Sequence, residues 1–508
     1  MPTRDLPIRV TAHQGPWPWH DAAASRALEQ AALARAEPGA LMGRAGLSVA
    51  RLAAALAPHA ARVKVWAGPG NNGGDGLVAA LHLHRAGRQV TVHLIADPAR
   101  LPVDAARALQ AATSAGVAVH ASGPAPAGAA LVIDALLGLG TTRAPAGDLA
   151  QAIAHINEAG APVLAVDIPS GLHPDTGTVL GDAAVRARAT LALLTLKPGC
   201  FTHQGRDHAG EVWLDTLGVP ARDPSGWLTS APAILPRAHA THKGSLGDVA
   251  VVGGAAGMVG AAWLAAGAAL AAGAGRVYCS LLIEGVLAPP PGRPELMMRA
   301  ALWRAAPALL SATTVVCGCG GGDSVRQALP ALLSHAGRLV LDADALNAIA
   351  ADPDLQTLLG HRAGRRLPTL LTPHPLEAAR LLACSAAEVQ RDRIGAAAAL
   401  AARHGASVLL KGSGTVIASP GRLALINGTG NAALACPGTG DVLAGWAGGL
   451  WAQQPDALAA DVAAAAAWQH GQAADNHAHR LPGRPLRAMA LIEAMMRVTG
   501  AELAAARR

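Results

Sequence analysis

Two glycine-rich motifs in the C-terminal half of the chain combine residue types that suit phosphoryl transfer. Gly428-Thr429-Gly430-Asn431 is followed, after a short apolar gap, by Gly438-Thr439-Gly440-Asp441, and a helical pattern begins at Val442. Glycines let the backbone come close to a ligand, and a helix start offers unpaired N–H groups to an anion. We therefore predict a phosphate cradle formed by the N–H groups of residues 438–440, with the Asp441 carboxylate beside it.

A second motif of this kind lies far upstream. Asn71-Asn72-Gly73-Gly74-Asp75 follows a strand-like apolar run at residues 63–66 and precedes a helical pattern that begins at Leu77. It predicts another strand, loop and helix that can hold an anion. Two such sites indicate two active domains.

Composition narrows the function classes. The chain has 508 residues, more than one core usually serves, so two domains are expected. Aromatic residues make up only 2%, which disfavours nucleic-acid binding because base stacking needs aromatic faces. The net charge of +7 suits acidic small molecules. Lysine occurs only at Lys64, Lys197, Lys243 and Lys411, and the last three, beside glycine or proline motifs, mark places that need a compact ammonium group.

The cysteines and the apolar runs indicate whether the chain is secreted, membrane-bound or cytoplasmic. Six cysteines form no disulfide framework, and Cys317-Gly318-Cys319 lacks a second pair at zinc-site spacing, which fits a reduced cytoplasm. Residues 1–15 mix charge and proline and show no secretion signal. Residues 249–275 carry no charge and are long enough to span a bilayer. Their alanine and glycine content and the break at Gly253-Gly254 favour a buried strand, a turn and a helix, so we predict no membrane association.

Strand and helix patterns alternate through the first half of the chain. Strands are predicted at residues 63–66, 89–95, 130–134, 163–167 and 190–194, with helices that include residues 22–36 and 77–86. This alternation predicts a doubly wound α/β fold with a parallel sheet. Chain breakers at Pro220, Pro224, Gly226 and Pro232 end the pattern, and we place a domain boundary near residue 226.

The same alternation restarts after His242. Strands are predicted at residues 249–252, 314–317, 339–342, 370–371 and 408–411. We therefore expect a second α/β domain with three layers.

Taken together, these motifs resemble the bifunctional NAD(P)H-hydrate repair enzymes, from Leu41-Met42-Gly43-Arg44-Ala45-Gly46 to beyond Gly445. The resemblance implies a Rossmann-like epimerase domain at residues 1–226. It also implies an ADP-dependent dehydratase domain with a ribokinase-like fold at residues 227–508. The substrates would be NADHX and NADPHX, in which water has added across a nicotinamide double bond. The epimerase would interconvert the R and S epimers, and the dehydratase would restore NAD(P)H from the S epimer while ADP becomes AMP and phosphate.

In the N-terminal domain, Asp134 and Asp167 each end a predicted strand, where ligands of open α/β sheets bind. The resemblance implies K⁺ ligands at Asn72, Asp134 and Ser170, and Asp167 is our candidate acid/base for the epimerisation. Lys197 either assists or binds phosphate. Taken alone, Asp134 is also typical of a helix N-cap. The substrate positions implied by the family are Asn71, Asn72, Gly73, Gly74, Asp75, Gly138, Leu139, Gly140, Thr141, Thr142, Arg143, Ala144 and Asp167.

In the C-terminal domain, the resemblance assigns Asp441 as the general base that removes the proton from the hydrate hydroxyl, which then attacks the terminal phosphoryl group of the nucleotide. Mg²⁺ is expected on the ADP phosphates. The implied substrate residues are Ala261, Gly320, His374 and Asp441, and the implied nucleotide residues are Lys411, Gly412, Ser413, Gly414, Thr415 and Gly440.

The chain departs from the family pattern at three positions. Leu139 replaces a usual threonine, Cys319 replaces a common proline, and Pro437 replaces a small residue and lacks an N–H donor. His374, a histidine that follows a strand, is also typical of a surface or capping group. These departures put individual contacts in doubt, but the glycine spacing is kept.

Two other functions stay open. A small-molecule kinase of the ribokinase-like superfamily would keep residues 438–441 and release a stable phosphorylated product, but it gives no reason for the first domain. Alternatively, the N-terminal half is a non-catalytic binding module. The choices between NADHX and NADPHX and between ADP and ATP are open, and we expect a homo-oligomer.

Overall fold

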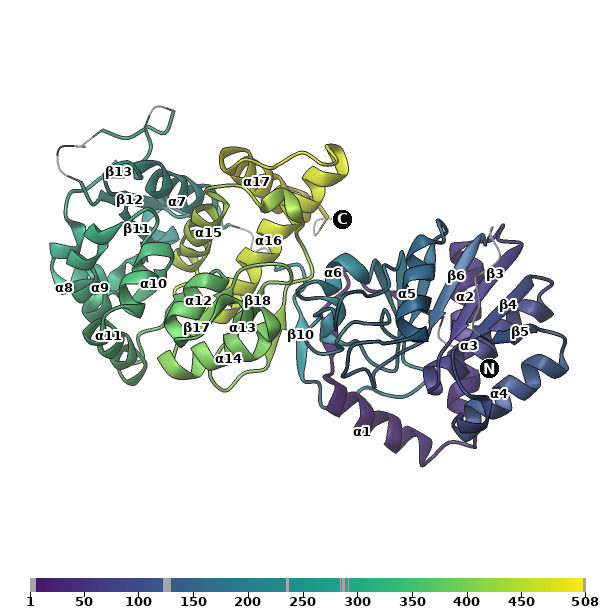
Figure 1. Cartoon of the computed structure of the whole chain (residues 1–508). Helices are drawn as coiled ribbons and strands as arrows, with labels where there is room; N and C mark the ends of the chain where they lie inside the picture. The colour runs from purple at the N-terminus through teal and green to yellow at the C-terminus, as the bar shows by residue number, and fades with distance from the viewer. Residues whose placement is uncertain are drawn as a thin grey trace. The chain divides into compact units, whose positions relative to one another are not determined.

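The computed structural model describes residues 6–121, 129–233, 237–283, 285, 288–290 and 292–505 (Figure 1). The chain forms two compact units. The first comprises Met1–Thr11 and Trp17–Trp227, and the second comprises Ala12–Pro16 and Leu228–Arg508. Each unit contains its own sheet with helices around it.

The sheet of the first unit has eight strands in the order β1-β9-β8-β7-β6-β3-β4-β5. All neighbours are parallel except β1 and β9. The chain runs outward from β3 to β5 and then returns to β6 and runs the other way, so the strand order reverses between β3 and β6. Ligands bind at such a switch point. The strands are β1 Ile8–Arg9, β3 Arg62–Ala67, β4 Gln89–Leu94, β5 Ala118–Ala121, β6 Leu131–Ala135, β7 Val163–Val166, β8 Ala189–Leu193 and β9 Glu211–Asp215, while β2 Pro18–Trp19 pairs with β10 Gly226–Leu228.

Helix α3 begins earlier than the sequence predicts. We expected a loop up to Gly76 and a helix from Leu77, but α3 spans Asn71–Arg85. The glycines of the motif serve packing: a Cβ on Gly73 would lie 2.1 Å from the Gly68 carbonyl oxygen, and one on Gly76 would lie 2.5 Å from the Ala135 Cβ. The other helices of this unit are α1 Ala22–Leu33, α2 Ala40–Leu56, α4 Val103–Ser114, α5 Asp148–Glu158 and α6 Gly205–His208, with short 3₁₀ turns at Pro98–Arg100 and Pro198–Cys200.

In the second unit the strand order is β13-β12-β11-β14-β15-β16-β17-β18-β19. The strands from β13 to β17 are parallel, and β18 and β19 continue the sheet antiparallel. All five strands predicted for this half are present. Their bounds are β11 Asp248–Gly253, β12 Arg276–Leu281, β13 Met297–Met298, β14 Thr314–Cys317, β15 Arg338–Leu341, β16 Thr369–Leu371, β17 Ser407–Leu410, β18 Val416–Ala418 and β19 Ala424–Ile426.

Helices cover both faces of this sheet and make three layers (Figure 1). Val249 and Val251 of β11 contribute to one core with α7, α15, α16 and α17, whereas Ala250 and Val252 contribute to the core on the other face. The helices are α7 Val259–Ala271, α8 Pro307–Ala312, α9 Leu329–His335, α10 Ala343–Ala350, α11 Pro353–Gly364, α12 Pro375–Leu382, α13 Ala386–Arg391, α14 Arg393–His404, α15 Thr439–Gln453, α16 Ala459–Arg480 and α17 Ala488–Ala505, with 3₁₀ turns at Lys243–Leu246, Leu302–Arg304, Asp323–Gln327 and Ala432–Leu434.

Helices α7 and α15 cross at very short range because both are rich in small residues. A Cβ on Gly445 would lie 2.0 Å from the Ala265 carbonyl oxygen, and one on Gly449 would lie 2.3 Å from that of Ala269. Residues 249–275 thus form a strand, a turn and a buried helix, as predicted, and within the described residues no helix is long and apolar enough to cross a bilayer. The predicted α/β architecture of both halves is confirmed.

Candidate functional site

A pocket of about 550 Å³ opens at the carboxyl ends of β3, β6 and β8 in the first unit. It lies where the strand order reverses, as expected for a doubly wound sheet. The predicted residues that line it are Asn71, Asn72, Asp75, Gly138, Leu139, Gly140, Thr141, Asp167 and Lys197.

A buried ion pair between Lys197 and Asp167 forms one wall of this pocket. The Lys197 ammonium also donates to the carbonyl oxygens of Leu193, at 2.7 Å, and Thr195, at 3.1 Å. Asp167 has a φ of +70°, a backbone conformation that costs a non-glycine residue energy and is common at functional sites. The carboxylate is thus held in a fixed place, facing the pocket.

Three further carboxyl groups, those of Glu29, Asp75 and Asp104, share the pocket with Asp167. Burial raises the pKa of Asp75 well above its usual range, and the charges of Asp167 and Glu29 add to this effect. Burial also raises the pKa of Glu29, with a further contribution from Asp167. The sequence analysis missed Glu29 and Arg26, which reach the pocket from α1, because nothing near them in the sequence marks a ligand site.

Two of the three residues expected to bind K⁺, Asp134 and Ser170, hydrogen-bond each other, and the third, Asn72, lines the pocket. The Ser170 hydroxyl donates to Oδ1 of Asp134 at 2.7 Å, and the Ser170 N–H donates to Oδ2 at 2.9 Å. Oδ1 of Asp134 also accepts from the Leu136 N–H at 3.2 Å, but the next helix, α5, begins only at Asp148. Asp134 therefore does not cap a helix, which was the simpler alternative. Asn72 Nδ2 is buried with no hydrogen-bond partner among the described residues, and its amide group lies about 3.1 Å from where a Cβ on Gly138 would be.

The other predicted residues of this unit do not line the pocket. Gly73 and Gly74 are buried in the packing of α3, and a Cβ on Gly74 would lie 2.5 Å from the Met42 side chain. Thr142, Arg143 and Ala144 are exposed on the loop that follows β6.

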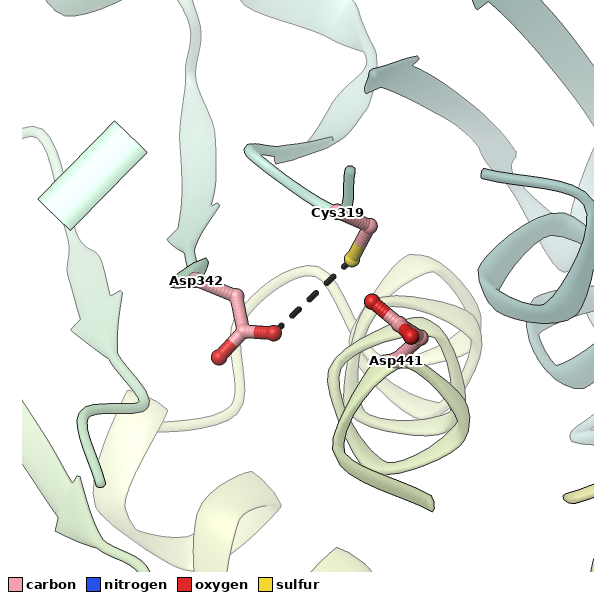
Figure 2. Close-up of side chains that lie close together, drawn as sticks. All are labelled: Cys319, Asp342 and Asp441. Carbon is pink, nitrogen blue, oxygen red and sulfur yellow. Dashed lines mark hydrogen bonds between the residues drawn. The ribbon is translucent and has the colours of Figure 1, made fainter. Parts of the chain in front are cut away.

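In the second unit, three side chains from separate elements converge at the carboxyl end of the sheet. Cys319 follows β14, Asp342 follows β15, and Asp441 lies in the first turn of α15, and one ligand atom of each lies within 4.8 Å of the others (Figure 2). The sequence predicted a role for Asp441 but not its neighbours. Cys319 was noted only as a departure from the family pattern.

Lys411 links this cluster to the expected nucleotide loop. Its ammonium group lies 2.6 Å from Oδ1 of Asp342, which also accepts from the Thr372 hydroxyl at 2.7 Å. A Cβ on Gly440 would lie 3.4 Å from the same ammonium group, so Lys411 stands beside the start of α15. The cation and the helix start together suit an anionic phosphate.

Burial raises the pKa values of two carboxyl groups at this site toward neutral pH. Burial, with a further contribution from the Asp342 charge, raises the pKa of Asp441 to about 6. Burial raises the pKa of Glu377 to about 7, although Lys411 opposes this shift. A carboxylate with a pKa near the working pH is suited to general base catalysis.

His374 is a helix cap as well as a predicted substrate residue. Its Nδ1 accepts from the N–H groups of Leu376, at 3.1 Å, and Glu377, at 3.3 Å. His374 is therefore the N-cap of α12. The Glu377 carboxylate accepts from the His374 N–H at 2.8 Å, which completes a capping box. The other ring nitrogen, Nε2, lies 3.2 Å from Oε1 of Glu377, so both ring nitrogens of His374 have a partner within its own helix.

The expected phosphate cradle has fewer donors than predicted. Gly438 has a φ of +86° and precedes α15, as the motif requires. However, the Thr439 N–H already donates to the Cys436 carbonyl oxygen at 3.4 Å, and the Thr439 hydroxyl contacts the carbonyls of Leu434 and Cys436, both at 2.9 Å. The earlier motif is a structural loop, because Gly430 N–H and the Asn431 amide donate to Asp475 of α16, both at 2.8 Å.

The remaining predicted residues lie in two glycine turns and, for Ala261, in the first turn of α7. A Cβ on Gly320, which has a φ of +59°, would lie 2.9 Å from the Ala261 Cβ, so these two predicted residues adjoin. The turn at residues 411–415 is held by Arg393, a buried side chain that the sequence analysis missed. Its guanidinium donates to the carbonyl oxygens of Leu410 and Lys411, both at 3.1 Å, and Gly414, at 3.4 Å.

Comparison with known proteins also divides the chain into two parts. Residues 38–199 match the family model described as YjeF-related protein N-terminus, and residues 249–496 match the model described as NAD(P)H-hydrate dehydratase. The bifunctional NAD(P)H-hydrate repair enzyme Nnr of Escherichia coli is 37% identical over 482 residues, 91% of this chain and 90% of the relative. Nnr of Coxiella burnetii is 37% identical over 86% of this chain and 90% of its own length.

A solved structure of an ADP/ATP-dependent NAD(P)H-hydrate dehydratase from Bacillus subtilis, co-crystallised with ATP and Mg²⁺, is 28% identical. The comparison covers 53% of this chain and 94% of that one, with a TM-score of 0.44. The family expected from the motifs is confirmed by the curated relatives, which match both halves of the chain. The chain belongs to the bifunctional NAD(P)H-hydrate repair enzymes.

Proposed function

We propose that this chain repairs hydrated NADH and NADPH. Residues 1–226 interconvert the R and S epimers of NAD(P)HX, and residues 227–508 convert the S epimer to NAD(P)H while ADP becomes AMP and phosphate. The main support is the position of Asp441, which lies at the start of α15 beside Lys411 and Asp342, in a chain whose relatives carry this name. A reduced, cytoplasmic location and a homo-oligomer stay predictions.

In the epimerase pocket, Asp167 is the proposed acid/base. The hydrated ring carbon carries a hydroxyl next to the ring nitrogen, so the nitrogen lone pair can expel the hydroxyl once it is protonated. Water then adds to the other face and gives up a proton, which restores the proton count. Asp167, fixed by Lys197, is placed to exchange these protons with the substrate.

The proposed K⁺ ligands have suitable chemistry. Burial raises the pKa of Asp134 to about 6, although its hydrogen bonds to Ser170 oppose the shift. A cation bound beside this carboxylate would favour its ionised form. The oxygens of Asn72, Asp134 and Ser170 would hold the ion, and the full burial of the Asp134 carboxylate supports this assignment. Bound K⁺ would supply a fixed positive charge beside the pocket.

In the dehydratase site, Asp441 is the proposed general base. It takes the proton of the hydrate hydroxyl, whose oxygen attacks the terminal phosphorus of ADP and releases AMP. The phosphate ester then breaks at its carbon–oxygen bond, the adjacent ring carbon loses a proton, and the dihydronicotinamide is restored. Lys411 and the free N–H groups at the start of α15 would bind the transferred phosphoryl group.

Mg²⁺ would be held chiefly by the ADP phosphates and water. Asp342 and Asp441 are the nearest carboxylates, whereas the Cys319 sulfur is a poor ligand for this hard ion. When bound, Mg²⁺ neutralises phosphate charge. The choice of ADP over ATP is implied by the family resemblance, and the preference between NADHX and NADPHX stays open.

A mixture of R and S hydrates tests both activities at once. With ADP and Mg²⁺, the wild-type chain should consume both epimers and regain the dihydronicotinamide absorbance. Asp441→Ala should still equilibrate the epimers but not dehydrate them, and Asp167→Asn should consume only the S epimer. A persistent phosphorylated product would instead indicate a kinase, and consumption of the S epimer alone by the wild type would indicate a non-catalytic first unit.

A further inference from the structure

The sulfur of Cys319 points into the polar cluster of the dehydratase site. Figure 2 shows its side chain directed toward Asp342 and Asp441. Cys319 is fully buried, and its thiol contacts Oδ2 of Asp342 at 3.9 Å and also hydrogen-bonds Asp441, two weak contacts for a sulfur donor. Burial and these two carboxylates raise the pKa of the Cys319 thiol well above its usual range, so the thiol keeps its proton until a metal ion displaces it. Cys319 belongs to a hydrophobic core, as Cys279 and Cys317 do, but it is the member of this trio whose sulfur also lies within 4.8 Å of two carboxylate oxygens.

The charges around this sulfur favour a cation. Oδ1 of Asp342 is occupied by the Lys411 ammonium and the Thr372 hydroxyl, so Oδ2 faces the sulfur. The carboxylates of Asp342 and Asp441 and the ammonium group of Lys411 together carry a net charge of −1. Loss of the Cys319 thiol proton would make this charge −2. A divalent cation would neutralise them, although the Lys411 ammonium repels it in part.

We propose that Cys319, Asp342 and Asp441 form an inhibitory binding site for a thiophilic divalent cation, for which Zn²⁺ is the best match. One sulfur and two carboxylate oxygens, with water as a fourth ligand, form a donor set that Zn²⁺ accepts and that Mg²⁺ does not favour. The family commonly has proline at this position, and proline has no side-chain donor atom. The site is thus a property of this chain.

The geometry needs only a small adjustment. Zinc bonds of about 2.3 Å to sulfur and about 2.1 Å to oxygen place tetrahedral ligand atoms roughly 3.6 Å apart. The three donor atoms already lie within 4.8 Å of one another, so rotation of the side chains would suffice. Metal binding would release the thiol proton. Because the ion occupies the Asp441 carboxylate, the proposed base could no longer take the substrate proton. The inhibition by Zn²⁺ rests on the proposed function, whereas the binding of Zn²⁺ does not.

Cobalt(II) provides a direct test of the site in the full-length chain, because a bound thiolate gives it a charge-transfer absorption band in the near ultraviolet. The wild type and Cys384→Ser, which removes the exposed cysteine, should both show the band, and added Zn²⁺ should abolish it. Cys319→Ser and Cys319→Pro should both lack it. An absent band in the wild type, or a band that persists in both Cys319 variants, would overturn the proposal.

Inhibition is measured separately. Zn²⁺ should inhibit dehydration by the wild type, and Cys319→Pro should need at least about tenfold more Zn²⁺ for the same effect, since even partners that only orient a ligand contribute about this much affinity. Equal sensitivity of both chains would refute the inhibitory role. If the wild type does not dehydrate NAD(P)HX, the proposed function fails, but the cobalt band still decides whether the site exists.

Discussion

The ammonium group of Lys411 lies 2.6 Å from Oδ1 of Asp342, although 69 residues separate them in the sequence. Each follows a strand, β17 or β15, and β16 lies between these two strands in the sheet. The pair therefore bridges three strand ends and places a cation beside the first turn of α15.

Lys411→Met should destabilise the second unit by about 2–3 kcal/mol, because it leaves a buried Asp342 carboxylate without its cation. The Thr372 hydroxyl and the partial exposure of Lys411 keep the loss below that of a fully buried pair. The double variant Lys411→Met/Asp342→Asn should be more stable than Lys411→Met alone. Urea denaturation measures this, and additive losses in the double variant would show that the two groups do not interact.

Dehydration should depend on pH through Asp441. Burial raises the pKa of Asp441 to about 6, and a general base acts only when ionised, so kcat/KM should fall about tenfold per pH unit below that value and level off above it. Glu377, whose pKa is about 7, also titrates nearby. Glu377→Gln is therefore the control, and it should keep the acid limb. A profile that is flat between about pH 5 and pH 7 would contradict the role of Asp441.

Gly445→Ala should destabilise the second unit by about 1–3 kcal/mol, because the new methyl group would meet the Ala265 carbonyl oxygen in α7. Gly360 of α11 is the matched control: it is exposed, and a Cβ there meets nothing within 4 Å. Gly360→Ala should stabilise by about 0.5–1 kcal/mol, since alanine is the better helix former. Equal effects at both sites in chemical denaturation would show that α7 and α15 pack less closely than described.

Glu29→Gln should slow epimerisation about a hundredfold at neutral pH, because the raised pKa of Glu29 lets this group exchange protons in the Asp167 pocket. The facing charged groups Arg26, Asp75, Asp104 and Lys197 stay in place in this variant. Dehydration of purified S hydrate should not change, since it uses the other unit. Epimerisation at the wild-type rate would leave Glu29 with no part in the reaction.

The strands predicted from the sequence are present in both units because each is a short apolar run flanked by polar or glycine turns, whereas β5, β9 and β12 were not predicted. The start of α3 does not follow from the sequence, because glycines at residues 73, 74 and 76 are typical of loops. In the fold they permit close packing against Gly68, Met42 and Ala135, which no local pattern reveals. Tertiary contacts therefore override the weak helix propensity of glycine.

The candidate site residues could also be predicted only in part from the sequence. The motif of residues 438–441 predicts a phosphate-binding helix start, and Asp441 lies there. Glu29 and Arg393 gave no signal, because Glu29 lies in an alanine-rich helix far from the motifs and Arg393 acts through backbone carbonyls of a distant turn. His374 had both a ligand and a capping interpretation, and the structure gives it the capping role without testing the other.

The central claim is that the hydroxyl of the hydrate, deprotonated by Asp441, attacks the terminal phosphorus of ADP. It is tested most directly with S-NADHX whose hydroxyl carries the heavy oxygen isotope, incubated with ADP and Mg²⁺. The account predicts that the label appears in the released phosphate and that Asp441→Ala releases none. Label found in water, with unlabelled phosphate, would contradict it.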